Sequence, residues 1–524
     1  MNALLAARLS PLSALPLVAS ALAIFACSAA ARGAPAAFPG AIGQGALASG
    51  GRGGDVYHVT TLADYDPKTE AKIEGSLRHG VRSAQGPRTI VFDVSGAIAL
   101  HAELEIRKSD LTIAGQTSPG GITLWGYPIE ISRASNVIVR YLRVRLSDIH
   151  VRRSSEGTAP AGSRNDLDPA SANGMYVGNG SDRIILDHCS VAWGIDETLS
   201  VTRARNVTIQ HSIISDSFNK SLHPKGPHGY GSLIRGEVTA QDQQQGTGGY
   251  TLYGNLWAHH RGRSPSLGGQ QELDDGQAEA DRRAADVNLV NNVVYDWGGQ
   301  ATHRSELGLV RANVIGNYYI SGPAKNGDYS FRENVPDVTV VYQRDNLQDM
   351  DEDAQHDGKA VAANDVRDAF RDFGDEDELR SDGEPLGFLG AVAPRVVPAE
   401  QAYENVVQQA GASLWRDAID RRVIESLTAR TGGLIDSQER YRDSAGKLPG
   451  IDDLQEQHRP RDFDADGDGM PNDFESTAGL DPKNPADGAA TTLSSEGYTN
   501  LEVYLHRLTE AAGPSSRQGA SAAR

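Results

Sequence analysis

The sequence predicts an all-β protein built as a parallel β-helix, a solenoid in which each turn of the chain lays its strands beside those of the turn before. Three observations predict this fold. Short β-branched runs recur, start to start, at intervals of 26, 47, 23, 43, 37 and 21 residues, which fit a repeat of about 22–26 residues. No helical pattern separates these runs. Glycine is abundant and aromatic residues form only 6% of the chain, which favours many turns and short strands.

Other repeat architectures lack a required feature. Leucine-rich repeats need a leucine framework that is absent here, and a propeller blade needs about 40 residues. The β-branched runs begin at Asp110, Asn136, Arg183, Asn206, Gly249, Asp286 and Leu307. The sixth residue after each start forms a column that becomes asparagine in its last members, Asn255, Asn292 and Asn313. This column predicts a stacked side-chain ladder at a recurring bend.

The N-terminal segment 1–37 is expected to be a secretory signal peptide. Arg8 is followed by the apolar residues 9–26 and then by small residues, as at a signal cleavage site. Prolines interrupt the apolar run, which is too short for a comfortable membrane span. Secretion is therefore expected, with a periplasmic or Cys27-lipidated form as the alternative. After signal removal Cys189 is the only cysteine, so no internal disulfide is expected.

The predicted β-helix occupies residues 38–330, and the pattern changes over residues 331–445. Residues 344–384 hold 15 Asp and Glu against 5 Lys and Arg, which predicts a solvated and partly mobile loop. Residues 399–429 have helical spacing and are expected to pack back on the solenoid as a brace. The net charge of −19 argues against non-specific nucleic-acid binding. Because over half of it lies in the acidic stretch, a polyanionic substrate is not excluded.

Residues 446–510 are predicted to form a small module around a calcium loop. The segment from Asp464 to Glu475 fits the pattern D-x-D-x-D-G-x5-E at every fixed position, with oxygen ligands, a turn glycine and a closing glutamate. The expected ligands are Asp464, Asp466, Asp468, Met470 and Glu475. Pro471 and the short flanks resemble the single loops of dockerin or thrombospondin type 3 repeats, which implies a structural role. The tail 511–524 is expected to be disordered.

Two segments of the predicted β-helix carry residues suited to chemistry on an acidic substrate. Asp196 and Glu197 end a β-branched run, and a cationic turn with Arg263 follows about 60 residues later. Acids can hold a metal, and an arginine can bind an anion. Three other arginines alternate along one predicted strand and are expected to be solvated: Arg140, Arg143 and Arg145.

Taken together, the solenoid, the signal segment and these motifs resemble the pectate lyases of polysaccharide lyase family 1. The resemblance runs from residue 38 to about residue 437. It rests on the segments Thr112–Thr117, Ile185–His188, Trp193–Ser200, Lys225–Gly231 and Arg263–Pro265. It implies a right-handed β-helix and a secreted enzyme, expected to be monomeric. This enzyme would cleave α-1,4-linked polygalacturonate by β-elimination, assisted by calcium.

The resemblance also implies roles for individual residues. Arg263 matches the base that removes the C5 proton, and Asp196 matches a calcium ligand in the substrate groove. The implied groove calcium set is Asn173, Asp196, Glu197 and Ser200. The residues expected to hold substrate carboxylates are Lys220, Lys225 and His228. Asn173 and Ser200 stand where acids are usual, and Gly268 replaces a further arginine, so weaker calcium binding is expected.

Two other functions stay open. The departures at Asn173, Ser200 and Gly268 are compatible with a non-catalytic or impaired glycan-binding β-helix. The same scaffold could carry a hydrolase, although no matching set of three acids is found in one groove. Ultraviolet absorbance of an unsaturated product would separate the three, because only a lyase makes a new double bond.

Overall fold

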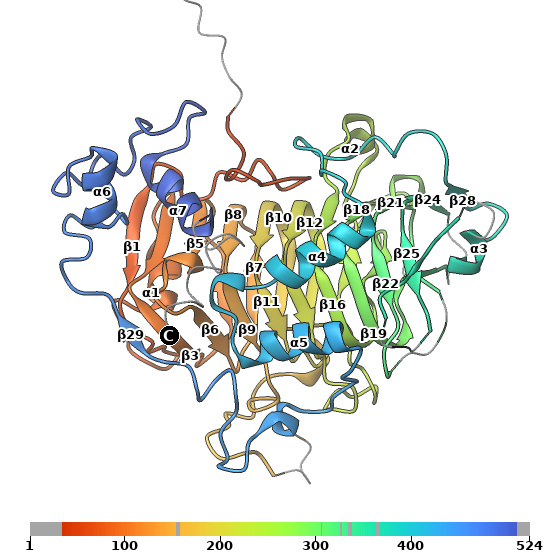
Figure 1. Ribbon diagram of the computed structural model, residues 1–524, viewed down its shortest axis with the longest axis horizontal. Coiled ribbons are helices and arrows are strands. Elements are labelled where there is room, and N and C mark those ends of the chain that lie inside the picture. The colour runs from red at the N-terminus through yellow and green to blue at the C-terminus, as the bar shows by residue number, and fades with distance from the viewer. Residues whose placement is uncertain are drawn as a thin grey trace, which may run out of the picture. The chain divides into compact units, whose positions relative to one another are not determined.

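The computed structural model describes residues 34–153, 158–304, 307–324, 327, 329–333, 338–351, 353, 355–362 and 366–510. The predicted signal segment up to residue 33, which includes Cys27, and the predicted disordered tail lie outside the described residues. Most of the described strands belong to one sheet of 18 strands and another of 11 (Figure 1). None of the described helices is both long enough and apolar enough to cross a membrane.

The elements divide between the two sheets and a set of short helices. The 18-stranded sheet contains β1 (Asp55–Val59), β2 (Arg88–Phe92), β4 (Leu104–Ile106), β5 (Leu111–Ala114), β7 (Ile129–Ser132), β8 (Ser135–Arg140), β10 (Met175–Asp187), β12 (Leu199–Gln210), β14 (Leu233–Arg235), β15 (Tyr250–Tyr253), β17 (Ser266–Gly268), β18 (Ala285–Val290), β20 (Thr302–Arg304), β21 (Val310–Ile315), β23 (Phe331–Arg332), β24 (Thr339–Arg344), β27 (Phe370–Arg371) and β28 (Glu378–Arg380). The 11-stranded sheet contains β3 (Val94–Ala99), β6 (Ile122–Trp125), β9 (Leu142–Arg145), β11 (Ser190–Ala192), β13 (Ile213–Ser215), β16 (Leu256–Gly262), β19 (Val293–Gln300), β22 (Tyr318–Ile320), β25 (Leu347–Asp349), β26 (Lys359–Ala360) and β29 (Gln457–His458). The α-helices are α1 (Leu77–Ser83), α2 (Ala240–Gln245), α3 (Val366–Ala369), α4 (Ala399–Gln409), α5 (Ala418–Ala429), α6 (Asn472–Ala478) and α7 (Asn500–Glu510). The 3₁₀ turns are η1 (Gly115–Thr117), η2 (Pro169–Ser171), η3 (Glu279–Asp281), η4 (Ser413–Trp415) and η5 (Gln438–Tyr441).

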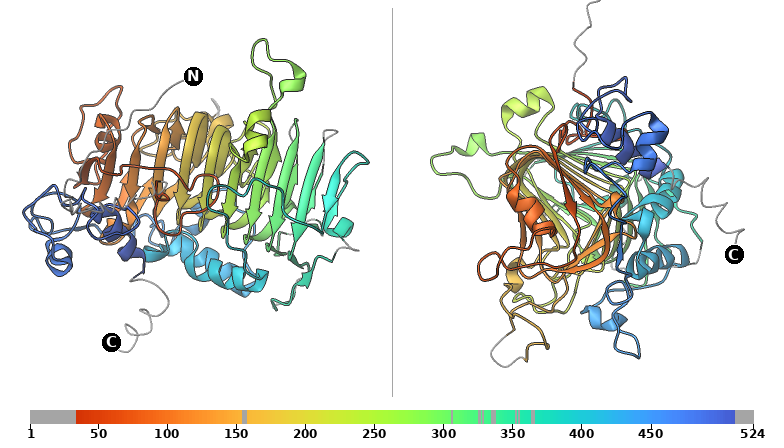
Figure 2. Two further views of the ribbon diagram at one scale, coloured as in Figure 1. Left: turned by 90° about the horizontal axis from the view of Figure 1, so that it is seen from above. Right: turned by 90° about the vertical axis from the view of Figure 1, so that its left-hand side faces the viewer.

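The predicted repeat corresponds to one turn of the solenoid. In the parallel pair β10–β12, Ile184 lies beside Val207 and Leu186 beside Ile209, and all four side chains are buried. Figure 2 shows strands of successive turns lying side by side in this way. A parallel strand covered on both faces needs apolar residues at its inward positions. Every turn meets this need with a β-branched run, and the predicted parallel β-helix is confirmed.

A buried asparagine ladder joins the same bend of successive turns. The side-chain oxygen of Asn292 accepts the backbone N–H of Asn255 at 3.0 Å, and that of Asn317 accepts the backbone N–H of Asn292 at 2.9 Å. Asn346 extends the series with another 2.9 Å hydrogen bond. The ladder was predicted, but its assignment to Asn313 is wrong. Asn313 lies inside β21, and the ladder position of that turn belongs to Asn317.

Replacing Asn292 with alanine is expected to destabilise the protein by about 2–4 kcal/mol. The change removes the acceptor for the Asn255 amide and the donor to the Leu252 carbonyl. Each buried group left unpaired costs about 1–3 kcal/mol. Chemical unfolding measures the loss, and Asn405→Ala on α4 is the matched control. A difference within about 0.5 kcal/mol, as for an ordinary surface substitution, would contradict the ladder's role.

The β-helix extends beyond residue 330, where the sequence predicted it to end. Strand β24 pairs in parallel with β21 along its whole length, and β28 pairs with β24 in turn. Val341, just before the acidic stretch, and Phe370, within it, are fully buried in the main apolar core. The abundance of acidic residues concealed these inward positions. The boundary at 330 is corrected accordingly.

The predicted helical brace is confirmed. Helices α4 and α5 run along the outer face of the 11-stranded sheet (Figure 1). Val406 of α4 and Leu427 of α5 are buried in one apolar cluster with Leu256 and Tyr318 of the sheet. Apolar residues at helical spacing give each helix one apolar face, and the sheet offers the surface on which to bury it.

The prediction that Arg140, Arg143 and Arg145 are solvated is wrong, because all three are buried. Arg145 Nη2 lies 2.9 Å from a carboxylate oxygen of Asp417 and 2.7 Å from one of Asp420. Both acids belong to the start of α5, which covers this face of the strand. A buried charge needs a paired opposite charge. The brace therefore supplies both the cover and the countercharges.

The C-terminal module packs on the first turns of the solenoid. Leu501 and Leu505 of α7 share an apolar cluster with Ala114 at the end of β5. Arg52 Nε pairs with Glu502 at 2.8 Å. Strand β29 pairs antiparallel with β3, at the edge of the 11-stranded sheet. Residues from near the end of the described chain thus cover its beginning (Figure 1).

Candidate functional site

Three turns of the solenoid bring the predicted base Arg263 together with Asp196 and Glu197, which were predicted as calcium ligands. The backbone of Glu197 bridges to that of Tyr230, and Tyr230 bridges to Gly262, as isolated parallel pairs. Glu197 and Tyr230 lie just before β12 and β14, and Arg263 lies just before β17. Residues far apart in sequence therefore meet at the amino ends of three strands. We call Asp196, Glu197, Tyr230 and Arg263 the Arg263 site.

Arg263 lies between a carboxylate and an aromatic ring. Its Nη1 donates to Glu197, and its guanidinium carbon lies 4.1 Å from the centre of the Tyr230 ring. The Arg263 side chain is 20% exposed, whereas that of Glu197 is 5% exposed. The charge-assisted hydrogen bond and the cation–π contact together fix the direction of the guanidinium group.

This arrangement shifts the pKa values of two side chains, Glu197 and His303. Burial and then the charge of Asp196 raise the pKa of Glu197 to about 7, against the opposing effect of Arg263. His303 of β20 is buried, and burial together with the charge of Arg263 lowers its pKa to about 3. His303 is therefore neutral at ordinary pH. The sequence analysis missed His303, because no local pattern marks a residue on a later turn as a neighbour of Arg263.

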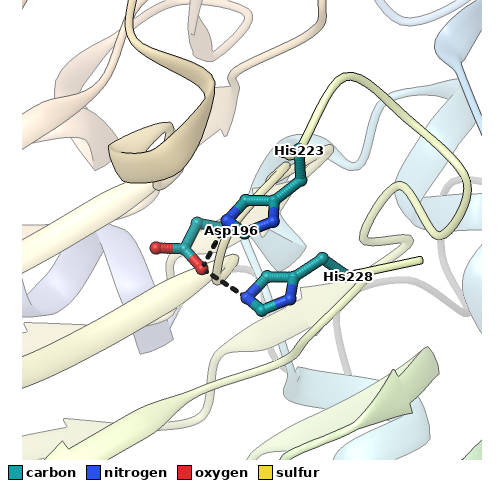
Figure 3. Close-up of side chains that lie close together, drawn as sticks. All are labelled: Asp196, His223 and His228. Atoms are coloured by element: carbon teal, nitrogen blue, oxygen red, sulfur yellow. Dashed lines mark ion pairs between the residues drawn. The ribbon is translucent and has the colours of Figure 1, made fainter. Parts of the chain in front are cut away.

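Asp196 faces two histidines (Figure 3). Its Oδ1 lies 2.8 Å from Nε2 of His228 and 3.6 Å from Nε2 of His223. The two imidazole rings are stacked, with centroids 3.6 Å apart and planes 5° from parallel. The sequence analysis assigned His228 to substrate binding and did not identify His223. Both histidines come from the loop between β13 and β14.

The four residues predicted to bind calcium here have different surroundings. The side-chain oxygen of Asn173 accepts the backbone N–H of Glu197 at 3.1 Å, and the carboxylate of Glu197 faces Arg263. The Ser200 hydroxyl is buried and has no hydrogen-bond partner among the described residues. Calcium takes six to eight oxygen ligands. Because Asp196 faces two nitrogens instead, these residues do not fit a calcium ion held by the protein.

The predicted substrate lysines belong to the same loop as the histidines. Lys220 and Lys225 are exposed, and the backbone amide of Lys225 donates to Nδ1 of His223 at 3.2 Å. Further along the sheet, a cavity of about 320 Å³ is lined by three arginines, Arg203, Arg235 and Arg283, together with acidic and amide side chains. The acids are Glu237, Glu272 and Asp274, and Arg283 pairs with two of them, so the cavity carries no excess of positive charge. Of its arginines, Arg235 lies near enough to Glu197 for its charge to oppose the rise in the pKa of that carboxyl.

The predicted calcium loop of the tail contains buried carboxylate oxygens. Asp464 accepts the backbone N–H groups of Gly467 at 2.7 Å and Gly469 at 2.8 Å, which shapes the loop. Met470 is buried against α7. Within the described residues of this module, five carboxylate oxygens are buried without a hydrogen-bond partner: Asp466 Oδ2, Asp468 Oδ2, Glu475 Oε1 and Oε2, and Asp487 Oδ1.

These oxygens converge as the ligands of a hard cation do. Ligand atoms of Asp468, Glu475 and Asp487 lie within 4.8 Å of one another, and so do those of Asp464, Asp466 and Asp468. Burial and the neighbouring carboxylates raise the pKa of Asp468 to about 8 and that of Glu475 to about 7. Buried acids without a countercharge are unfavourable, so this set fits calcium. Asp487 lies outside the twelve-residue pattern, and the sequence analysis therefore missed it.

The chain is similar in sequence to known proteins over about nine-tenths of its length. No protein-family model matches the chain. It is 34% identical over 485 residues to "Probable pectate lyase C" of Emericella nidulans, covering 92% of this chain and 95% of that protein. It is also 34% identical over 477 residues to the protein of the same name from Neosartorya fischeri, covering 90% and 93%. Among solved structures, the cedar pollen allergen Jun a 1 is similar with a TM-score of 0.47 and 16% identity, covering 71% of this chain and 92% of that one.

Proposed function

This chain belongs to the pectate lyases, which are polysaccharide lyases, and we propose that it cleaves α-1,4-linked polygalacturonate by β-elimination with Arg263 as the base. The observation that carries the proposal is the position of Arg263. Its guanidinium is oriented by Glu197 and Tyr230 at the amino ends of three adjacent strands, beside exposed lysines. We also propose secretion, on the signal-like sequence of residues 1–37.

In the proposed reaction Arg263 removes the C5 proton of a uronate residue. The electrons of the C–H bond form a double bond between C4 and C5, and the C4–oxygen bond breaks. The departing oxygen takes a proton from water. Negative charge grows beside the uronate carboxylate during this step, so cationic groups lower the barrier. Lys220 and Lys225, with Arg235 nearby, are the residues that we assign to neutralising substrate carboxylates.

Arg263 must be neutral to accept a proton, although a guanidinium group is normally protonated. Glu197 contacts Nη1 directly and is mostly buried, so it is positioned to receive the proton that the guanidinium releases. Tyr230 keeps the guanidinium plane in place during this exchange. In this scheme Glu197 is a positioning and proton-accepting residue for Arg263 and does not contact the substrate.

We further propose that the protein binds calcium in its tail loop, through Asp464, Asp466, Asp468, Glu475 and the additional Asp487. The buried unpaired oxygens of this loop support the proposal. Bound calcium would neutralise carboxylates that otherwise repel one another. Assistance of the elimination itself by calcium is a prediction from the resemblance. The residues around Asp196 do not fit that ion, so no step above passes through it.

Incubation of the full-length protein with polygalacturonate tests the proposal. We expect ultraviolet absorbance to rise, because elimination creates a double bond conjugated with the carboxylate. Reducing ends without absorbance would instead indicate a hydrolase. Binding without either signal would indicate a glycan-binding β-helix, and both outcomes would reject the proposed function.

A further inference from the structure

We propose that Asp196, His223 and His228 form a binding site for a divalent transition metal such as zinc, in place of the calcium that the family resemblance implies. The three side chains come from two loops, one before β12 and one before β14, and their ligand atoms lie within 4.8 Å of one another (Figure 3). The ability to bind metal does not depend on the proposed function. The role of the metal in the reaction does.

Hydrogen bonding alone leaves part of this geometry unexplained. His228 Nε2, at 2.8 Å from Asp196 Oδ1, is within hydrogen-bonding distance. His223 Nε2, at 3.6 Å from the same oxygen, is beyond it. Even so, the His223 ring is stacked on that of His228 and presents the same edge to Asp196. Both Nε2 atoms therefore face the same carboxylate, although the parallel rings must tilt apart before both nitrogens can bind one ion.

The spacing of the three ligand atoms matches tetrahedral zinc. Three ligands at about 2.1 Å from one ion lie about 3.4 Å from one another in a tetrahedron. The two distances from Asp196 Oδ1, 2.8 Å and 3.6 Å, lie on either side of that value. All three ligand atoms lie within 4.8 Å of one another. Rotation of the two stacked rings away from each other would complete the site.

The donor types exclude calcium as the preferred ion. Calcium binds through oxygen ligands alone, whereas imidazole nitrogens with one carboxylate suit zinc and its first-row neighbours. The nearest other acid, Glu197, is engaged with Arg263, and the Asn173 side-chain oxygen accepts a backbone amide. The histidines thus supply ligands at the point where the predicted oxygen set is incomplete.

The position of the site, close to Arg263, would allow a bound metal to contact the substrate. A zinc ion with three protein ligands keeps one position open. The Tyr230 ring contacts His228 edge-on, with centroids 4.4 Å apart, and its face carries Arg263. A metal bound by Asp196 would thus lie one aromatic ring away from the proposed base. If the proposed function holds, the open position would take a uronate carboxylate oxygen and draw charge from the developing double bond.

One contact must change when metal binds. The Lys225 amide donates to Nδ1 of His223, which places the proton of the neutral ring on Nε2. Metal binding at Nε2 moves that proton to Nδ1, where it opposes the Lys225 amide. The turn between His223 and Gly226 then has to release this amide. We expect hydrogen exchange of the Lys225 amide to become faster in the zinc-bound protein.

The test is calorimetric titration of the full-length protein with zinc in the absence of substrate. All metal is first removed from the protein, and excess calcium is then added to occupy the tail loop. We expect one zinc ion to bind. His223→Gln and His228→Gln should each weaken it by more than the roughly 10–100-fold that loss of a supporting residue causes. His458→Gln, at an exposed histidine far along the sequence, is the matched control and should bind zinc normally.

The inference would be overturned if no zinc bound in the presence of calcium, or if both histidine variants bound zinc as tightly as the unchanged protein does. The absorbance assay with polygalacturonate separates it from the proposed function. Zinc binding by a protein that produces no absorbance would reject the function and keep the site. Full absorbance from both histidine variants, shown to be zinc-free, would reject the role of the metal in the reaction.

Discussion

Arg263→Lys is expected to lower turnover of polygalacturonate by about 10²–10⁴-fold, the range that a positioned acid or base contributes. Lysine keeps the positive charge but loses the planar group that spans Glu197 and the Tyr230 ring. The proton-accepting nitrogen would then no longer be fixed relative to C5. Because misplacement of a reacting group is costly, retaining the charge should not restore the rate.

The measurement is the initial rate of product absorbance at saturating substrate. Circular dichroism and the unfolding midpoint confirm that the variant is folded. Arg261→Lys, two residues away on an exposed side chain of β16, is the matched control and should react normally. A folded Arg263→Lys protein with a near-normal rate would remove Arg263 from the mechanism.

Removing calcium is expected to detach the tail module from the first turns of the solenoid. Without the ion, Asp468, Glu475 and Asp487 would repel one another, and the loop would open. The interface made by Arg52 and Leu501 would then lose its support. A ligand present at 100 times its Kd stabilises the state that binds it by about 2.7 kcal/mol. Removing calcium should lower the stability of the docked tail module by a similar amount.

Hydrogen exchange across residues 464–505, with and without a chelator, measures this release. Glu475→Gln should show fast exchange even in calcium, because it loses a ligand that can supply two oxygens. Asp473→Asn, at an exposed position of α6, is the control and should keep the calcium response. Identical exchange in calcium and in chelator would contradict a calcium site in the tail.

The fold could be predicted from the sequence because the same packing contacts recur in every turn. Each turn buries pairs such as Ile184 and Val207, so each turn must carry the same β-branched signature. The burial of Arg145 was not readable, since the helix that covers it begins only at Ala418. The same applies to the end of the β-helix, where the many acidic residues concealed inward ones such as Phe370.

The candidate site was readable in part for similar reasons. Asp196, Glu197 and Arg263 stand in recognisable motifs, and the structure brings all three together. His223 and Asp487 occupy no pattern. Their positions depend on the paths of the loops that follow β13 and α6. Such loops carry no periodic sequence pattern from which a prediction could be made.

The closure of the solenoid by its own tail has a consequence for how the protein is made. Strand β3 forms an edge of its sheet until β29 pairs with it, and β5 lacks its cover until α7 arrives. The ribosome produces the first turns long before either element. Nascent chains therefore carry an unprotected strand edge through most of translation, and such edges recruit other chains. Truncated products that stop before β29 would keep this edge open and should be the main source of aggregates during expression.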